Sequence, residues 1–173
     1  MNLENLVKAA IFNSIAIGLG FAFFFIPNVE FISVVVFISG LTLGTLFGLI
    51  VGGTSMLIYS GLNPLGSGLI FLPLFFSQII AMAGIGVFGS LNRYLLVKLP
   101  IKILVPFTGL LGALSAIWYD LMTTVAYPIS VGQNLNEIIT FAISGLLFTT
   151  AHIISNSLIF SIVIPTYINR ITS

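Results

Sequence analysis

The feature that most constrains this chain is the scarcity of charge along its 173 residues. It carries five Lys or Arg and four Asp or Glu side chains, 5% of the sequence, whereas charged residues make up roughly 25% of an ordinary soluble domain. A soluble domain of this length needs a charged surface, which this composition cannot supply. The composition therefore excludes a soluble enzyme, a nucleic-acid-binding protein and a disordered segment, and it indicates a helical membrane protein.

Long apolar stretches predict where the chain crosses the membrane. A helix needs about 20 apolar residues to span a bilayer core of about 30 Å. We predict an all-α membrane protein, a six-transmembrane-helix bundle that forms a single integral membrane domain over residues 1–173. The predicted helices span residues 6–26, 31–41, 44–61, 70–91, 103–125 and 138–166. A transmembrane β-barrel is disfavoured because residues 32–38 and 71–76 are continuously apolar, without the alternation of barrel strands.

The number of crossings depends on the apolar stretch from Phe31 to Tyr59, which is long enough for one tilted helix or two short ones. Basic residues concentrate on the cytoplasmic side of membrane proteins. Six crossings place all the cations on that side together with both termini, whereas five crossings separate the first cation from the others. The cations are Lys8, Arg93, Lys98, Lys102 and Arg170. We therefore predict a break near residues 40–44.

Two rows of small residues follow the spacing of one helix face. The first helix carries Ala10, Ser14, Gly18 and Ala22, each four residues apart. The second row is Gly40, Gly44, Gly48 and Gly52, and its continuity favours one unbroken helix as the alternative to the predicted break. Small residues let membrane helices approach closely. Both rows are interpreted either as packing inside the bundle or, for the first row, as a face for another subunit.

Polar side chains in predicted membrane helices are candidate sites, because each is unfavourable in hydrocarbon without a partner. Asp120 is the sharpest candidate, and it either binds a ligand or anchors a loop. His152 and Asn156 are four residues apart and more often form an interhelical hydrogen-bonded pair than a metal site. No metal site is predicted, because the chain offers too few ligands at this depth. The remaining candidates for substrate binding are Asn28, Glu30, Tyr59, Asn63, Gln78, Trp118, Tyr119, Tyr127 and Asn134.

The chain has no motif for hydrolysing ATP. A P-loop needs Gly before its Lys, whereas each Lys here follows Val or Ile. Uptake against a gradient therefore needs a partner or an ion gradient. We find no clear inverted repeat of the kind that ion-coupled carriers contain.

Several motifs in a fixed order carry a resemblance to a known family. They are the small-residue first helix, Pro27-Asn28-Val29-Glu30, the glycine row from Gly40, Asn63-Pro64-Leu65-Gly66-Ser67-Gly68, Gln78, Trp118-Tyr119-Asp120 and the pair of His152 with Asn156. Together they resemble the substrate-binding S component of energy-coupling factor (ECF) vitamin transporters. The resemblance covers essentially the whole chain.

The resemblance implies a non-enzymatic, multi-pass protein of the prokaryotic plasma membrane. It implies that a vitamin is bound from outside as transported ligand, with no cofactor, and that a transmembrane coupling subunit and two cytoplasmic ATPases are the protein partners. In this family the first helix docks on the coupling subunit through an Ala-x-x-x-Ala motif. The matching residues here are Ala10, Ser14 and Gly18, with Ser in place of the second Ala.

The resemblance leaves the substrate open. Cobalamin is the first expectation, because the Pro-Asn-Val-Glu turn and the later His-x-x-x-Asn resemble the cobalamin-type branch. Riboflavin, thiamin, a queuosine precursor and lipoate are alternatives. A self-contained small carrier or channel is the main alternative function. An intramembrane enzyme that uses Asp120 and His152 is a more remote one.

Overall fold

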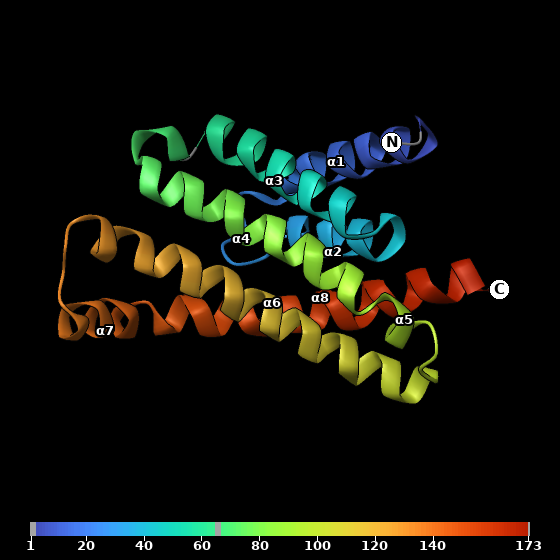
Figure 1. The fold of residues 1–173 in the computed structure, drawn as a ribbon. Helices are drawn as coiled ribbons and strands as arrows, with labels where there is room; N and C mark the ends of the chain where they lie inside the picture. Colours follow the sequence, from blue (N-terminus) through green and yellow to red (C-terminus); the bar gives the residue numbers. More distant parts are fainter. Residues whose placement is uncertain (1–2, 65–66, 173) are drawn as a thin grey trace.

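The computed structural model describes residues 3–64 and 67–172, and within these ranges its regular structure is entirely helical (Figure 1). The elements in chain order are α1 (Leu3–Phe23), α2 (Ile32–Leu43), α3 (Thr45–Leu62), the short 3-10 helix η1 (Gly68–Ile70), α4 (Leu72–Leu91), α5 (Arg93–Leu96), α6 (Ile101–Ser130), α7 (Leu135–Ser144) and α8 (Leu146–Thr172). The prediction of an all-α protein is confirmed for this part of the chain.

Five of the described helices are long and apolar enough to cross a membrane, namely α1, α3, α4, α6 and α8. The chain is therefore a multi-pass membrane protein by the length and composition of its helices. The remaining predicted crossing corresponds to α2, which has 12 residues. At 1.5 Å per residue it is about 18 Å long, which is shorter than the bilayer core.

The predicted break between the second and third helices is present at Gly44. This residue ends α2 and precedes α3 with φ +91° and ψ 179°, a left-handed backbone conformation that favours glycine. The alternative of one continuous helix through the glycine row is therefore wrong. The four-residue spacing of these glycines reflects close packing of helix backbones and not one unbroken helix.

Helix α2 forms the core of the bundle. Every residue from Ile32 to Leu41 is buried, and α2 packs against α1, α3, α4 and α8. The sequence explains this burial, because α2 is apolar around its whole circumference, as expected of a helix that is surrounded on all sides. Figure 1 shows α2 behind α4 and between the outer helices.

Glycines allow the backbones of α2, α3 and α4 to touch. A Cβ atom added to Gly40 or Gly48 would overlap the backbone of Gly86, and one added to Gly52 would overlap the backbone of Met82. The interpretation of this row as internal packing is confirmed at these three positions. Without side chains at the contact, the backbones approach more closely than Leu or Val would permit.

The structure corrects the predicted ends of the last two helices. Helix α6 continues through Pro128 to Ser130, whereas the prediction ended it at residue 125. The predicted final helix, residues 138–166, is instead two helices that meet at Gly145. An Asn134–Glu137 capping box begins α7 inside the predicted loop. Helix α8 also continues past Pro165, because backbone groups within a membrane favour the helix over exposed alternatives.

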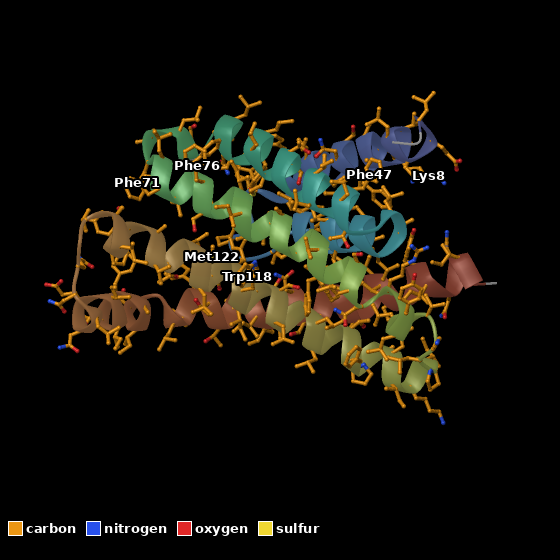
Figure 2. All side chains as sticks on the ribbon, in the orientation of Figure 1. Lys8, Phe47, Phe71, Phe76, Trp118 and Met122 are labelled. Carbon is orange, nitrogen blue, oxygen red and sulfur yellow. The ribbon has the colours of Figure 1, made fainter. Side chains whose placement is uncertain are left out.

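Basic residues gather at one end of the bundle. The two termini and α5 lie at the same end in Figure 1, and Lys8 lies at this end in Figure 2, far from Phe71. Arg93 begins α5, and Arg93, Lys98 and Ile171 line one surface pocket. Arg170 lies in the last turn of α8. Lys8, Arg93, Lys98 and Arg170 therefore lie at one end of the bundle, and the membrane side that this end faces stays a prediction.

Candidate functional site

A chain of hydrogen bonds crosses the interior of the bundle from α6 to α2. Asp120 Oδ1 lies 2.8 Å from His152 Nδ1, and His152 Nε2 lies 2.8 Å from Asn156 Nδ2. The hydroxyl of Ser33 donates to Asn156 Oδ1 at 3.0 Å. His152, Asn156 and Ser33 are buried. These hydrogen bonds therefore fix the imidazole ring at both of its nitrogens, and the Asp120 carboxylate accepts the Nδ1 proton.

The four residues meet because α8 packs against both α6 and α2. His152 and Asn156 lie one turn apart on α8 and face the same direction. Helix α6 packs along α8 and presents Asp120, while the first turn of α2 presents Ser33. His152 and Asn156 were predicted to form interhelical hydrogen bonds. They bond each other within α8, and the interhelical bonds run from His152 to Asp120 on α6 and from Asn156 to Ser33 on α2.

A cavity of about 240 Å³ opens beside this chain. Its lining combines polar and aromatic groups from α1, α3, α6, α8 and the segment that joins α1 to α2. The lining residues are Gly20, Phe23, Phe24, Ile26, Pro27, Asn28, Val29, Glu30, Met56, Tyr59, Tyr119, Asp120 and His152. Concave sites with a few convergent polar groups are typical of small-molecule binding.

The segment between α1 and α2 supplies six of the thirteen lining residues. Asn28 adopts φ 60°, a left-handed conformation that asparagine tolerates better than most residues. The segment brings Glu30 Oε1 to 3.8 Å from His152 Nε2. Glu30, a predicted substrate-binding residue, lies in this connecting segment, and its side chain is 25% exposed in the cavity wall. A loop that returns into the bundle is permitted when it lines a cavity.

One oxygen of Asp120 has no hydrogen-bond partner among the described residues. Asp120 Oδ1 accepts from His152, but Oδ2 is buried and unpaired. A buried acceptor without a donor is unfavourable, and for a carboxylate oxygen the penalty is larger than for a neutral group. The unpaired Oδ2 therefore marks a position where a ligand donor would be stabilising.

The two cavity tyrosines are held by polar side chains behind them. Tyr119 contacts the His152 ring edge to face, with ring centroids 6.0 Å apart, and its hydroxyl interacts with Gln78. Gln78 in turn accepts a hydrogen bond of 2.6 Å from Ser60. The hydroxyl of Tyr59 interacts with Asn63. Gln78 and Asn63, both predicted to bind substrate, thus position tyrosines and do not themselves line the cavity.

Three other predicted binding residues lie away from the cavity. Trp118 is 43% exposed, donates to the Ala81 carbonyl at 3.0 Å, and faces the junction of α4 with α6 (Figure 2). Tyr127 stacks on Phe141 near the far end of α6. Asn134 caps α7. The neighbours Trp118 and Tyr119 point in different directions because successive helical residues are about 100° apart.

Several site residues were not predicted. Ser33 completes the hydrogen-bond chain, and the cavity lining also includes residues that were not predicted, namely Gly20, Phe23, Phe24 and Met56. The sequence did offer a signal for Gly20, because a glycine in a helix that does not belong to the row of small residues needs a separate packing reason. A Cβ atom there would collide with Ile32 and approach Tyr59 closely. Ser33 carried no comparable signal, because serine is common throughout the chain.

The small residues of α1 lie on two different faces. Ala9, Ala16 and Gly20 are buried against the bundle. The predicted docking row lies on the outer face, where nothing is within 4 Å of a Cβ built on Gly18. All members of this row are exposed, namely Ala10, Ser14, Gly18 and Ala22. The Ser14 hydroxyl bonds the Ala10 carbonyl at 2.9 Å, so the row presents no unpaired hydroxyl.

Within the described residues, no group of three or more His, Asp and Glu side chains could hold a metal ion. Asp120 and Glu30 approach opposite nitrogens of His152, so the three side chains do not converge on one point. The site is therefore organised as a hydrogen-bonding surface.

Comparison with known proteins identifies no relative, since no family model, curated protein or solved structure matches the chain significantly.

Proposed function

We propose that this protein is the substrate-binding S component of an ECF-type importer, which captures a vitamin or related micronutrient. The observation that carries the proposal is the cavity beside Asp120 and His152. It combines convergent polar groups, aromatic walls and an unpaired carboxylate oxygen inside an apolar bundle. A membrane protein that has only a packing function has no use for such a site, because each buried polar group is unfavourable.

The outer face of α1 supports the docking part of the proposal. Ala10, Ser14 and Gly18 form a smooth surface on the outside of the bundle. A helix face that contacts only lipid has no need of small residues, because lipid chains pack well against Leu and Phe. A row of small residues instead allows another helix to approach closely. We assign this row to the coupling subunit. The absence of a P-loop motif from the sequence agrees with ATPases that reside in separate chains.

The cavity volume bears on the substrate. Pockets for drug-sized ligands have volumes of about 300–1,000 Å³, and this cavity is about 240 Å³. The volume favours a compact, single-ring or two-ring compound. A corrinoid is far larger, so cobalamin as substrate requires the segment between Phe24 and Glu30 to move outward. Among the candidates, thiamin and a queuosine precursor match the size better than cobalamin does.

Two measurements on the purified full-length chain test the proposal. Mass spectrometry of small molecules that co-purify with the chain identifies the ligand, and pull-down from native membranes detects a coupling subunit with two ATPases. The proposal expects a vitamin-like compound and both types of subunit. It fails if the chain recruits no such subunits, or if it binds no vitamin at sub-micromolar concentration.

The alternative of a self-contained carrier or channel predicts flux into liposomes from the purified chain alone, without an ATPase. The structure gives this alternative less support, because the ten consecutive buried residues of α2 fill the bundle on the side of the cations. The enzyme alternative gains one feature, since Asp120 and His152 do meet. However, His152 Nε2 faces the Asn156 amide and not a hydroxyl nucleophile.

A further inference from the structure

We propose that the ligand of this cavity is a small molecule with a positively charged nitrogen next to a flat ring. The inference rests on the proposed function and specifies the chemical class of the substrate. It follows from the charges that face the cavity, the unpaired oxygen of Asp120 and the aromatic walls.

The charged groups of the cavity have an excess of negative charge. Glu30 and Asp120 supply two carboxylates, and His152 is the sole basic side chain in the lining. Even a protonated His152 leaves one carboxylate without compensation. The five Lys and Arg residues lie at the other end of the bundle or at its termini, so none of them reaches the cavity. A cationic ligand supplies the missing charge.

The position of the unpaired oxygen specifies a hydrogen-bond donor. His152 occupies Asp120 Oδ1, which leaves Oδ2 free and buried. An ammonium or a protonated ring nitrogen that donates to Oδ2 forms a charge-assisted hydrogen bond, which is stronger than one between neutral groups. An anionic or purely accepting ligand would instead place two acceptors against each other in a site of low dielectric constant.

The aromatic lining adds attraction for the same class of ligand. Tyr59, Tyr119 and Phe24 surround the cavity, and the faces of aromatic rings attract cations. Flat ligand rings also pack well against such walls. Tyr59 is itself steadied by Phe21, with ring centroids 5.2 Å apart. The lining is thus suited to a compact cation with a ring and is unsuited to a carboxylate or phosphate compound.

Three probes that differ mainly in charge test the inference on the purified full-length chain in detergent. Benzylamine is cationic at neutral pH, benzyl alcohol is neutral and benzoate is anionic. We expect benzylamine to raise the melting temperature at millimolar concentration more than the other two do. Equal shifts with all three, a larger shift with benzoate, or no shift with benzylamine overturns the proposal.

Two charge-neutralising variants then locate the interaction. Glu30→Gln and Asp120→Asn should each weaken benzylamine binding about tenfold or more, the loss expected for one charge-assisted hydrogen bond. Glu4→Gln removes an exposed carboxylate that pairs with Lys8 on α1, and it should leave binding unchanged. If Asp120→Asn does not fold, Glu30→Gln decides, because its side chain lies in a connecting segment. Unchanged affinity in the folded variants contradicts the inference.

Identification of the co-purifying ligand provides a separate readout. A cationic or amine-bearing compound supports the inference, and an anion such as lipoate overturns it. Recruitment of a coupling subunit is measured independently of ligand charge. An anionic ligand with normal recruitment therefore removes only this inference, whereas a cationic ligand without recruitment removes only the proposed function.

Discussion

Asp120 and His152 are 32 residues apart in sequence, and a 2.8 Å hydrogen bond between Oδ1 and Nδ1 joins α6 to α8. The bond lies beside the cavity, so it links the stability of the bundle to the shape of the site. A double-mutant cycle with Asp120→Ala and His152→Ala should give a coupling free energy of about 1–3 kcal/mol, as expected for partners in one buried network. Unfolding of the detergent-solubilised protein measures it. Additive effects of the two substitutions would contradict a direct bond.

The glycine contact among α2, α3 and α4 predicts a sharp difference between two glycines. Gly48→Ala should destabilise the protein by about 1–3 kcal/mol, because the added methyl group overlaps the backbones of Gly86 and Gly40. Gly18→Ala is the matched control on an open helix face, and it should be neutral or slightly stabilising. Thermal unfolding of both variants in the same detergent compares them. Equal destabilisation would refute the packing assignment.

The outer face of α1 is tested by a bulky substitution. Gly18→Phe should prevent co-purification of the coupling subunit and abolish uptake while ligand binding stays intact, because the ring blocks close approach of another helix. Leu57→Phe is the control, since Leu57 is also exposed but lies on α3. Pull-down and binding are measured on the same preparations. Loss of ligand binding in Gly18→Phe would instead show that the row packs inside the bundle.

Two adjacent aromatic residues on α6 predict different effects on ligand binding. Tyr119→Ala should weaken ligand affinity about tenfold or more, because Tyr119 lines the cavity and packs on His152. Trp118→Ala should leave affinity unchanged and reduce stability, since its indole bonds the Ala81 carbonyl on α4. Affinity by isothermal titration and stability by thermal unfolding separate the two. Equal loss of affinity in both variants would contradict the assigned cavity.

The Ser33 hydroxyl predicts an effect on the stability of the protein. Ser33→Ala leaves the Asn156 side-chain oxygen without the donor seen at 3.0 Å and should destabilise the protein by about 1–3 kcal/mol. Ser14→Ala is the control, because the Ser14 hydroxyl is exposed and bonds only the carbonyl of its own helix. It should be nearly neutral. A neutral Ser33→Ala in the unfolding assay would show that the hydrogen-bond chain ends at Asn156.

Much of the architecture follows from local patterns. Apolar stretches of about 20 residues predicted the long helices, and the one-sided cations predicted a break that the structure places at Gly44. Helix ends were predicted less well. The predictions ended the last two helices at residues 125 and 166, yet α6 continues through Pro128 and α8 continues past Pro165 to Thr172. In a bilayer the unpaired backbone groups of a broken helix have no water to bond, which outweighs the local effect of proline.

The sequence predicted several of the residues of the candidate site but not how they contact one another. Polar residues in apolar helices identified Asp120, His152 and Asn156, because such residues need partners. No pattern in the sequence predicts which hydrogen-bond partner each of these residues has in the fold. Glu30 reaches His152 through the fold of a connecting segment, and Trp118 faces away by one step of helical rotation. Both outcomes depend on tertiary packing, which periodicity along one helix does not encode.

The short, enclosed helix α2 determines how a bound molecule can leave. Its first turn carries Ser33 beside the site, and two turns further on Gly40 is pressed against the backbone of Gly86. Between the cavity and the basic end of the bundle there is therefore tightly packed protein, and the connecting segment before α2 forms part of the cavity wall. Under the proposed function, delivery to the opposite side of a membrane requires the opening of the cavity itself to turn toward that side, so that the protein moves with its cargo.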